Sequence, residues 1–460
     1  MPSARRQPEG PPGPTMELAS WAATIDYGAL PEKVVHEAKR TVLNFLGVAI
    51  GGSSHPAVLR SLAVAKALGG HPDCTVLGRA ERTDALFAAL INGISSHVLD
   101  FDDTHAPTIL HPGGAVLPAP LALSEWKQGS GRDLLLALVV GVEIACRAGL
   151  SVFPAHYDQG WHITGTAGSI GAAVAAARYL KLDRMRTAYA LGLGATQAAG
   201  FQEMFGTMAK PFHVGRAAQS GVLAALLAEQ GFTSSTAALE AERGWCHVSS
   251  HAVRMELLTA GLGKTWEILR NTYKPFACGV VTHPAIDGIV RLQRQRAITP
   301  SEVESIQVSV HKRVLEICGN AEPRTGLEGK FSIYHCCAIA LVDRAAGEAQ
   351  FSDARVLDPT VLAVRSRLTV MADEELRPEQ AVIAIQMRDG SQLRERVESA
   401  VGTLQNPMSD ADLEGKFLAL ATPVLGTEGA AEVLRVTWQL DDLAAMPDML
   451  QLCTPARSGA

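Results

Sequence analysis

Three segments built almost entirely from small and apolar residues limit what this chain can fold into. They cover residues 168–180, 188–199 and 217–228. A helix that is apolar all round is buried, and side chains as small as Ala and Gly let close-packed helices approach one another. These segments do not alternate with strand patterns, which disfavours a parallel-sheet α/β fold. Together with an aromatic content of only 5%, they predict a mainly α protein with a large all-helical domain.

The periodicity changes near Tyr273, where a second kind of structure is expected. Residues 303–310 alternate apolar and polar side chains, as a half-buried strand does. Two strand-like segments flank Asp389-Gly390, a dipeptide typical of tight hairpin turns. A helix is expected between these strands, over residues 332–346. This mixture predicts a compact α+β region.

These changes divide the 460 residues into four expected parts. The pattern becomes helical again after Asn406-Pro407, so we expect the chain to rejoin the helical domain there. The parts are a disordered tail (1–15), a helical domain (16–265 plus 406–440), an α+β lid domain (270–402) and a C-terminal tail (441–460).

Charge and cysteine content narrow the class of protein. The formal net charge is −6 and the sequence pI about 6.2, which argues against a nucleic-acid-binding face. The longest apolar run, 134–142, is far shorter than the roughly 20 residues that span a bilayer, so no membrane partner is expected. Eight cysteines without a CxxC pair indicate a reduced, cytoplasmic protein without a structural zinc site.

The densest group of polar residues is the stretch LDFDDTHAPTILHPGG. Its carboxylates cannot all be buried as anions without cationic partners or protonation. Carboxylates beside imidazoles can also tune a proton donor to neutral pH. The alternative is a solvated loop whose Asp residues cap the next helix. Because Thr104 and His111 accompany Asp100, Asp102 and Asp103, we interpret the stretch as part of an active site.

Two further candidates precede small-residue helices. In GWHITG, the flanking glycines let the backbone turn and present His162, although a lone His is more often a core residue. The motif KPFHVGRAA places Lys210, His213 and Arg216 at a helix start, where free N–H groups and the helix dipole favour an anion. An ordinary helix start with solvated basic residues is the alternative.

Two more motifs lie in the second region. YKPFACGVVTH places Lys274, Cys278 and His283 at the expected domain boundary, where ligand sites are common. A Lys could bind a carboxylate and a Cys–His pair could shuttle a proton, whereas a single such pair is a weak metal motif. In GKFSIYH, Tyr334 could donate a proton; alternatively it forms one core face with Phe331, three residues away.

This inventory of cations and proton carriers suits a small, multiply anionic substrate. Chemistry at a carbon next to a carboxylate needs preorganised positive charge to stabilise a carbanion or enediolate. The sequence has no GxSxG nucleophile elbow, no dinucleotide fingerprint and no P-loop. A non-catalytic helical binding protein is the alternative outside the enzymes.

At these motifs the chain resembles the MmgE/PrpD family, over about residues 16–440. That family includes 2-methylcitrate dehydratase, cis-aconitate decarboxylase and iminodisuccinate epimerase. The resemblance implies a large helical domain with a smaller α+β lid, a homodimer, and no metal or organic cofactor. It implies catalytic roles for Asp100, His111, His162 and Tyr334, and substrate binding by Thr104, Lys210, His213, Lys274, Cys278 and His283.

Two departures between family branches bear on the reaction. Cys278 stands where animal decarboxylases have a histidine, and fungal decarboxylase-like sequences are similar to this chain there. The motifs HPGG and KPFHVGRAA are closer to the decarboxylase and epimerase members than to the dehydratase branch. We therefore expect a cofactor-independent lyase acting on a small di- or tricarboxylate. Decarboxylation of a cis-aconitate-like acid ranks first, dehydration of a citrate-like acid second, and epimerisation or isomerisation third.

Overall fold

The computed structural model describes residues 13–455, which form two compact units. The first, called here the helical unit, contains residues up to 96, 107–270 and those from 420 onwards. The second, the mixed unit, contains residues 97–106 and 271–419. Most described residues are helical and the sheets are small, which confirms the prediction of a mainly α fold. The predicted tails at 1–12 and 456–460 lie outside the described residues.

The helical unit is a set of helices with one short antiparallel strand pair, β1 (Cys74–Thr75) and β2 (Arg82–Thr83). The helices are α1 (Pro14–Thr24), α2 (Glu32–Gly52), α3 (Pro56–Leu68), α4 (Ala85–His97), α5 (Pro112–Val116), α6 (Pro118–Trp126), α7 (Gly131–Val152), α8 (Ala155–Asp158), α9 (Ile163–Tyr179), α10 (Arg184–Thr196), α11 (Ala209–Glu229), α12 (Trp245–Ser249) and α20 (Met446–Leu452). Helix α19 (Asp410–Trp438) contributes its residues from Leu420 onwards.

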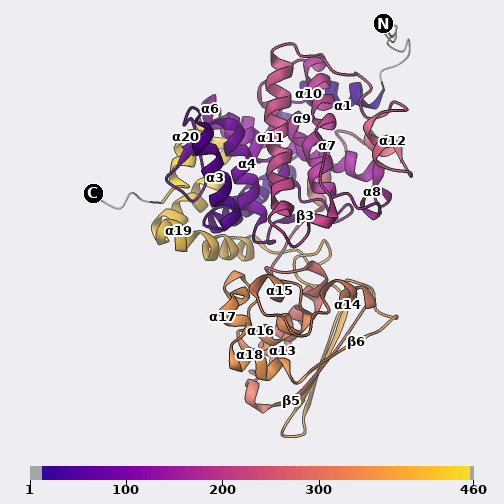
Figure 1. Cartoon of the computed structure of the whole chain (residues 1–460), viewed down its shortest axis with the longest axis vertical. Helices are drawn as coiled ribbons and strands as arrows, with labels where there is room; N and C mark the ends of the chain where they lie inside the picture. Colours follow the sequence, from indigo (N-terminus) through magenta and orange to yellow (C-terminus); the bar gives the residue numbers. More distant parts are fainter. Residues whose placement is uncertain (1–12, 456–460) are drawn as a thin grey trace. The chain divides into compact units, whose positions relative to one another are not determined.

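Helix α9 lies at the centre of this unit, packed against α7, α10 and α11 (Figure 1). Every residue of α9 except Arg178 is buried. Small side chains allow this close approach: a Cβ on Gly171 would meet the carbonyl oxygen of Gly141 on α7, and one on Gly221 would meet Ala172. The small-residue segments of the sequence therefore do pack at the centre.

Helix α7 is longer than the apolar run that predicted it. It begins after Ser130, whose side chain accepts a hydrogen bond from the amide of Asp133. By length and composition alone, α7 and α19 are long and apolar enough to cross a membrane, and the bent pair α2–α3 would make a third such span. For α7, 94% of the apolar window is buried inside the protein. A buried ion pair of this helix joins Glu143 Oε1 to Arg147 Nε at 2.7 Å.

The mixed unit is built on a four-stranded sheet in the order β6-β5-β7-β8. Strand β5 pairs in parallel with β6 and antiparallel with β7, and β7 pairs antiparallel with β8. Gly390, in the turn between β7 and β8, has a φ of +86°, which glycine adopts without strain. The strands are β5 (Val303–Val310), β6 (Leu368–Ala372), β7 (Ala381–Met387) and β8 (Gln392–Val397).

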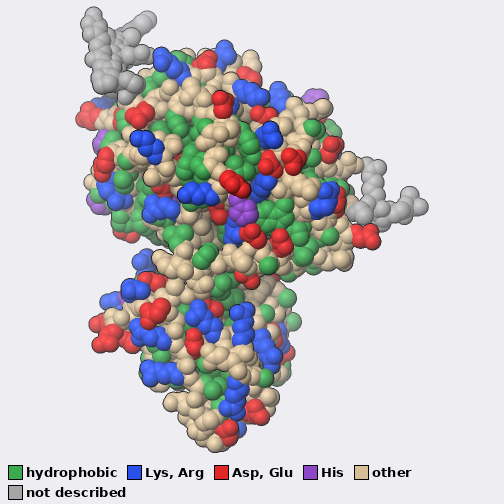
Figure 2. Space-filling view, turned by 180° about the vertical axis from the view of Figure 1, so that it is seen from behind, with side chains coloured by type: hydrophobic (Ala, Val, Ile, Leu, Met, Phe, Trp, Pro, Cys, Tyr) green, Lys and Arg blue, Asp and Glu red, His purple; other side chains and the backbone are tan. Residues whose placement is uncertain are grey.

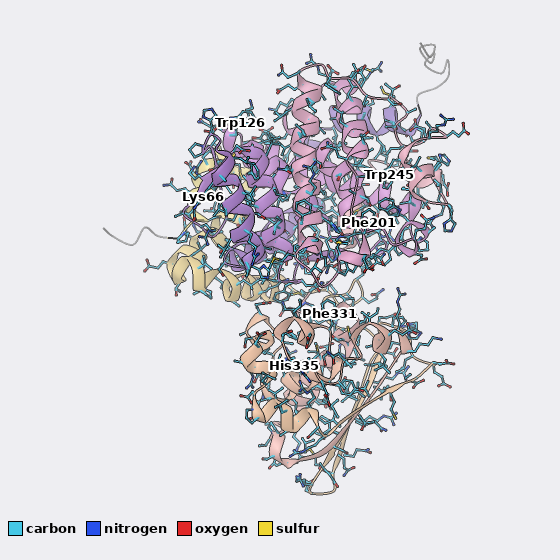
Figure 3. The ribbon with its side chains drawn as sticks, in the orientation of Figure 1. Lys66, Trp126, Phe201, Trp245, Phe331 and His335 are labelled. Atoms are coloured by element: carbon cyan, nitrogen blue, oxygen red, sulfur yellow. The ribbon has the colours of Figure 1, made fainter. Side chains whose placement is uncertain are left out.

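Helices complete the mixed unit. Helix α13 packs on β7 and β8, and α16 packs on α13 and α18. Figure 3 labels Phe331 and His335, which belong to this helical layer. The helices are α13 (His283–Gln295), α14 (Lys312–Cys318), α15 (Gly326–Lys330), α16 (Ile333–Val342), α17 (Asp353–Val356) and α18 (Pro359–Arg365).

Several boundaries differ from those expected from the sequence. Residues 97–106 group with the mixed unit, because β3 (Asp103–His105) pairs with β4 (Asn271–Tyr273). The helix expected over 332–346 ends at Val342. The chain after residue 441 is not simply a tail, because α20 buries Met446, Met449 and Leu450. At the other end, α1 already begins at Pro14.

Candidate active site

A buried ion pair lies at the start of the Asp-rich stretch. Lys274 Nζ is 3.2 Å from Asp100 Oδ1 and donates a hydrogen bond to the Asp100 carbonyl oxygen at 2.9 Å. The two side chains are only 5% and 13% exposed. The β3–β4 pairing, which sets Asp103 opposite Tyr273, brings these distant segments together. A buried pair of this kind is costly to separate, because each charge loses its partner in a poorly solvated place.

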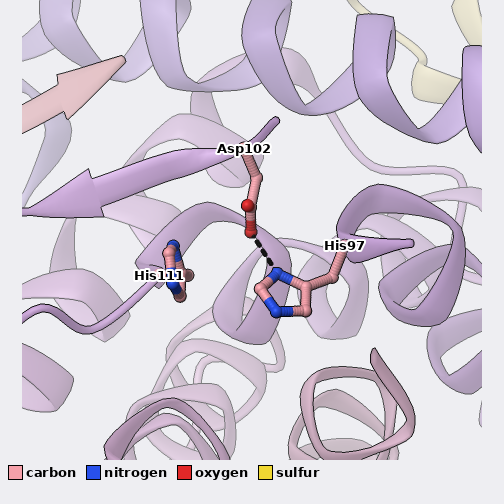
Figure 4. A group of neighbouring side chains, drawn as sticks. All are labelled: His97, Asp102 and His111. Carbon is pink, nitrogen blue, oxygen red and sulfur yellow. Dashed lines mark hydrogen bonds and ion pairs between the residues drawn. The ribbon is translucent and has the colours of Figure 1, made fainter. Parts of the chain in front are cut away.

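The other carboxylates of the stretch are also buried and partnered. Asp102 Oδ2 lies 2.6 Å from Nδ1 of His97 (Figure 4). Asp103 Oδ2 accepts a hydrogen bond from the side-chain amide of Asn271 at 2.7 Å. The solvated-loop alternative is therefore wrong for this stretch. An imidazole that is hydrogen-bonded to a carboxylate is held in one orientation.

Two lysines that the sequence reading missed hold the backbone of this stretch. Lys416 Nζ donates to the carbonyl oxygens of Phe101 at 2.6 Å and Lys274 at 2.9 Å. Burial, helped by the charge of nearby Lys274, lowers the pKa of Lys416 to about 7, although Asp102 and Asp103 oppose the shift. Lys330 Nζ donates to the carbonyl oxygen of Leu99 and to Glu348 Oε2, both at 2.6 Å. These contacts fix the backbone on either side of Asp100.

Cys278 and His283 form a second polar group in the mixed unit. Cys278 Sγ lies 3.3 Å from Thr282 Oγ1, and His283 Nε2 lies 3.3 Å from the Cys278 carbonyl oxygen. Burial alone would raise the pKa of the Cys278 thiol, but a hydrogen bond from Cys336 and the nearby His283 outweigh it and hold that pKa well below its usual value. These neighbours therefore stabilise the thiolate form of Cys278 relative to an isolated buried thiol.

In the helical unit, the two predicted histidines of separate motifs meet. His162 Nδ1 lies 3.0 Å from His213 Nδ1, and both residues are buried. The amide of His162 donates to the carbonyl oxygen of Gly200 at 3.0 Å. Gly200 has a φ of +135°, and a Cβ there would lie 3.1 Å from the His213 ring. The structure therefore needs glycine at 200 to bring the imidazoles together.

The remaining candidate residues of the helical unit are Lys210 and His111. The ring of Phe205 meets the His162 ring edge-on at 5.0 Å, and Lys210 Nζ lies 5.4 Å from the centre of the Phe205 ring. His111 immediately precedes α5, and its amide donates to Thr164 Oγ1 at 3.2 Å. Lys210 is thus near the imidazole pair at the start of α11.

Two predicted site residues of the mixed unit, Thr104 and Tyr334, lie in surroundings that differ from each other. Thr104 pairs with Thr272 across β3 and β4, and its carbonyl oxygen accepts from Thr272 Oγ1 at 2.7 Å. Tyr334 lines a cavity whose described lining includes neither Asp100 nor Lys274. The predicted catalytic role of Tyr334 stays a prediction.

The mixed unit thus contains a buried ammonium–carboxylate pair and a buried imidazole–carboxylate pair, and the helical unit contains a buried imidazole pair. Groups of these kinds are the ones that acid–base sites use. Family models of the MmgE/PrpD N-terminal domain and the MmgE/PrpD C-terminal domain match residues 16–258 and 276–442. The chain therefore belongs to the MmgE/PrpD family, as its motifs predicted.

Three curated relatives share one printed activity. A cis-aconitate decarboxylase of Aspergillus terreus (strain NIH 2624 / FGSC A1156) is 27% identical over 469 residues, covering 96% of each chain. The Homo sapiens cis-aconitate decarboxylase is 26% identical, covering 93% of this chain and 92% of its own. That of Mus musculus is 27% identical, covering 93% and 91%. This chain is thus similar to enzymes along nearly its whole length.

Proposed function

We propose that this protein is a cofactor-independent lyase that acts on a small di- or tricarboxylate, with decarboxylation of a cis-aconitate-like acid as the leading reaction. The observation that carries the proposal is the hydrogen-bonded imidazole pair His162–His213. A bond between two Nδ1 atoms requires one to carry a proton and the other to accept it. In the neutral pair, one ring then has a basic Nε2 and the other has an Nε2–H. The pair thus combines an acid and a base.

The proposal also depends on two lysine side chains, Lys274 and Lys210. The Lys274 ammonium has three donors, of which two are used by the carbonyl and carboxylate of Asp100, so the third can bind a substrate carboxylate. Lys210 can bind another, beside the imidazole pair. Fixed positive charge near a carboxylated carbon stabilises the negative charge that develops there. That the two groups of residues act on one substrate stays a prediction.

The proposed step balances without a co-reactant beyond a proton. The carbon–carbon bond to one carboxylate breaks and carbon dioxide leaves. The electron pair stays on the carbon skeleton, and an imidazole N–H gives its proton to carbon. The deprotonated imidazole recovers a proton from water. His162 or His111 is the proposed proton donor. The Asp100–Lys274 ion pair supplies one negative and one positive charge to the site.

Dehydration and epimerisation use the same groups differently. Both begin with removal of a proton next to a carboxylate, for which the basic Nε2 of the imidazole pair is suited. The similarity to three cis-aconitate decarboxylases favours carbon dioxide release over these alternatives.

A homodimer, a cytoplasmic location, and the absence of nucleic-acid and membrane partners complete the proposal. On the face drawn in Figure 2, basic and acidic side chains are interspersed.

One experiment distinguishes the reactions. The purified protein is incubated separately with cis-aconitate, citrate, 2-methylcitrate and iminodisuccinate, and products are followed by ¹³C NMR with trapping of carbon dioxide. We expect carbon dioxide and a decarboxylated acid from cis-aconitate. Water loss from a citrate-type acid would support the dehydratase alternative, and inversion without mass change the epimerase. Binding without turnover of any substrate would support the non-catalytic alternative.

A further inference from the structure

A cavity in the mixed unit is lined by none of the residues that the proposed reaction uses. Its volume is about 480 Å³. Polar and apolar side chains both line it, among them Glu322, Arg324, Tyr334, Leu357, Leu362 and Arg365. All six residues belong to the mixed unit and lie in the segment that follows α14 and ends with α18.

Arg365, the last residue of α18, is the most informative of these residues. Its Nη1 is buried and has no hydrogen-bond partner among residues 13–455. Burial lowers the pKa of Arg365, and the charge of Glu322 partly opposes this. A buried N–H of a cation without an acceptor is costly, and rotation of the guanidinium toward an anion in the cavity would offset that cost.

The remaining polar lining also suits an anion. Arg324 brings a second guanidinium, so two cationic groups face a single carboxylate, that of Glu322. Guanidinium groups bind carboxylates through paired, charge-assisted hydrogen bonds. The phenol of Tyr334 adds a further donor. One net positive charge suits a singly charged ligand better than a tricarboxylate.

The apolar side chains that line the cavity indicate what kind of molecule carries the anionic group. Leu357, which is 52% exposed, lies at the wall of the cavity, and Leu362 and Leu368 contribute more apolar surface. We propose that this cavity binds a small organic monoanion, a carboxylate on a short apolar body, between the two arginines and the leucine wall. The site is separate from the polycarboxylate chemistry proposed above and does not depend on it.

Isothermal titration of the whole protein with hexanoate tests this. The matched neutral ligand is hexanamide, which keeps the length and shape but not the charge. We expect saturable binding of hexanoate at millimolar concentration, at least about tenfold weaker binding of hexanamide, and weakening of hexanoate binding as salt is raised. Arg365→Gln should weaken hexanoate binding about tenfold or more, and Arg324→Gln less, because Arg324 is exposed.

Two variants keep the test decisive. Leu357→Glu adds a carboxylate at a half-exposed position, so it should fold normally and repel hexanoate. Arg394→Gln, at an exposed arginine on β8 outside the cavity, should bind like the unsubstituted protein. The proposal is overturned if hexanoate does not bind, if hexanamide binds equally well, or if folded Leu357→Glu and Arg365→Gln bind hexanoate as strongly as Arg394→Gln does.

Discussion

His162 and His213 share a hydrogen bond between like atoms, Nδ1 to Nδ1 at 3.0 Å, although 51 residues separate them in the chain. Two protonated rings would repel each other at this distance, so the geometry disfavours double protonation. The contact thus ties the protonation of one ring to that of the other. A proton taken up or released by one imidazole changes what its partner can do, which is how coupled sites titrate.

The first prediction concerns the proton carriers. His162→Ala and His111→Ala should each lower kcat on the true substrate at least roughly a hundredfold, because general acid–base groups contribute about 10²–10⁴-fold. Lys210→Ala is the control and should mainly raise KM, since it removes a carboxylate anchor. Steady-state kinetics and thermal melting are measured together. Histidine variants with near-normal kcat and a lower melting temperature would show that these residues are structural.

The second prediction concerns the buried pair Asp100–Lys274. Lys274→Met leaves a buried carboxylate without its cation and should destabilise the protein by about 3–5 kcal/mol. Asp100→Asn should cost less, because the ammonium keeps its bond to the carbonyl oxygen. The double variant should be more stable than the sum of the single effects indicates. Urea unfolding of all four proteins measures this coupling, and strictly additive effects would contradict a direct interaction.

The third prediction concerns metals. Imidazole and carboxylate groups such as His97 and Asp102 are also metal ligands, so a cofactor-independent mechanism is open to direct test. Activity should survive prolonged treatment with EDTA followed by gel filtration, because fixed protein charges supply the electrostatic stabilisation. Loss of activity that a single divalent metal restores would overturn the proposed mechanism.

Local patterns in the sequence were enough to predict the elements, but not the contacts that make the site. Small-residue segments, the alternation over 303–310 and Asp389-Gly390 all act through neighbouring residues, and the structure has a central helix, a strand and a hairpin there. The Asp100–Lys274 pair instead depends on strands β3 and β4, which lie far apart in the chain. No local pattern shows that such strands pair.

Lys330 and Lys416 show a second limit. A lysine in a sequence is usually solvated, so the sequence alone does not indicate that either residue is part of a site. In the structure both are buried and donate to backbone carbonyls beside Asp100. The one available indication was an isolated lysine before an apolar run, as in GKFLALA at residues 415–421. Conversely, helical spacing could not show which surroundings Tyr334 would have.

The last prediction concerns pH and His156 in the helical unit. This imidazole is fully buried, stacked on Trp161, and bonded to the Ser249 carbonyl oxygen and Thr166 Oγ1 at 2.9 and 2.8 Å. Burial lowers its pKa from 6.5 to about 4, with the bond to Ser249 opposing the shift. Between pH 6.5 and about pH 4, this imidazole therefore binds a proton in the unfolded chain but not in the folded protein. The stabilising contribution is therefore complete above pH 6.5 and is lost as the pH falls through about 4.

The expected size of this effect is about 3 kcal/mol, from a shift of roughly two and a half pKa units. Substitution of His156 by Gln keeps an amide for hydrogen bonding but removes the titration. The free energy of unfolding of the unsubstituted protein should therefore fall more steeply between pH 6.5 and 4 than that of His156→Gln, while the two curves run parallel above pH 7. Urea unfolding at pH steps across this range measures the difference. Equal slopes between pH 6.5 and 4 would show that His156 is protonated in the folded protein as readily as in the unfolded chain.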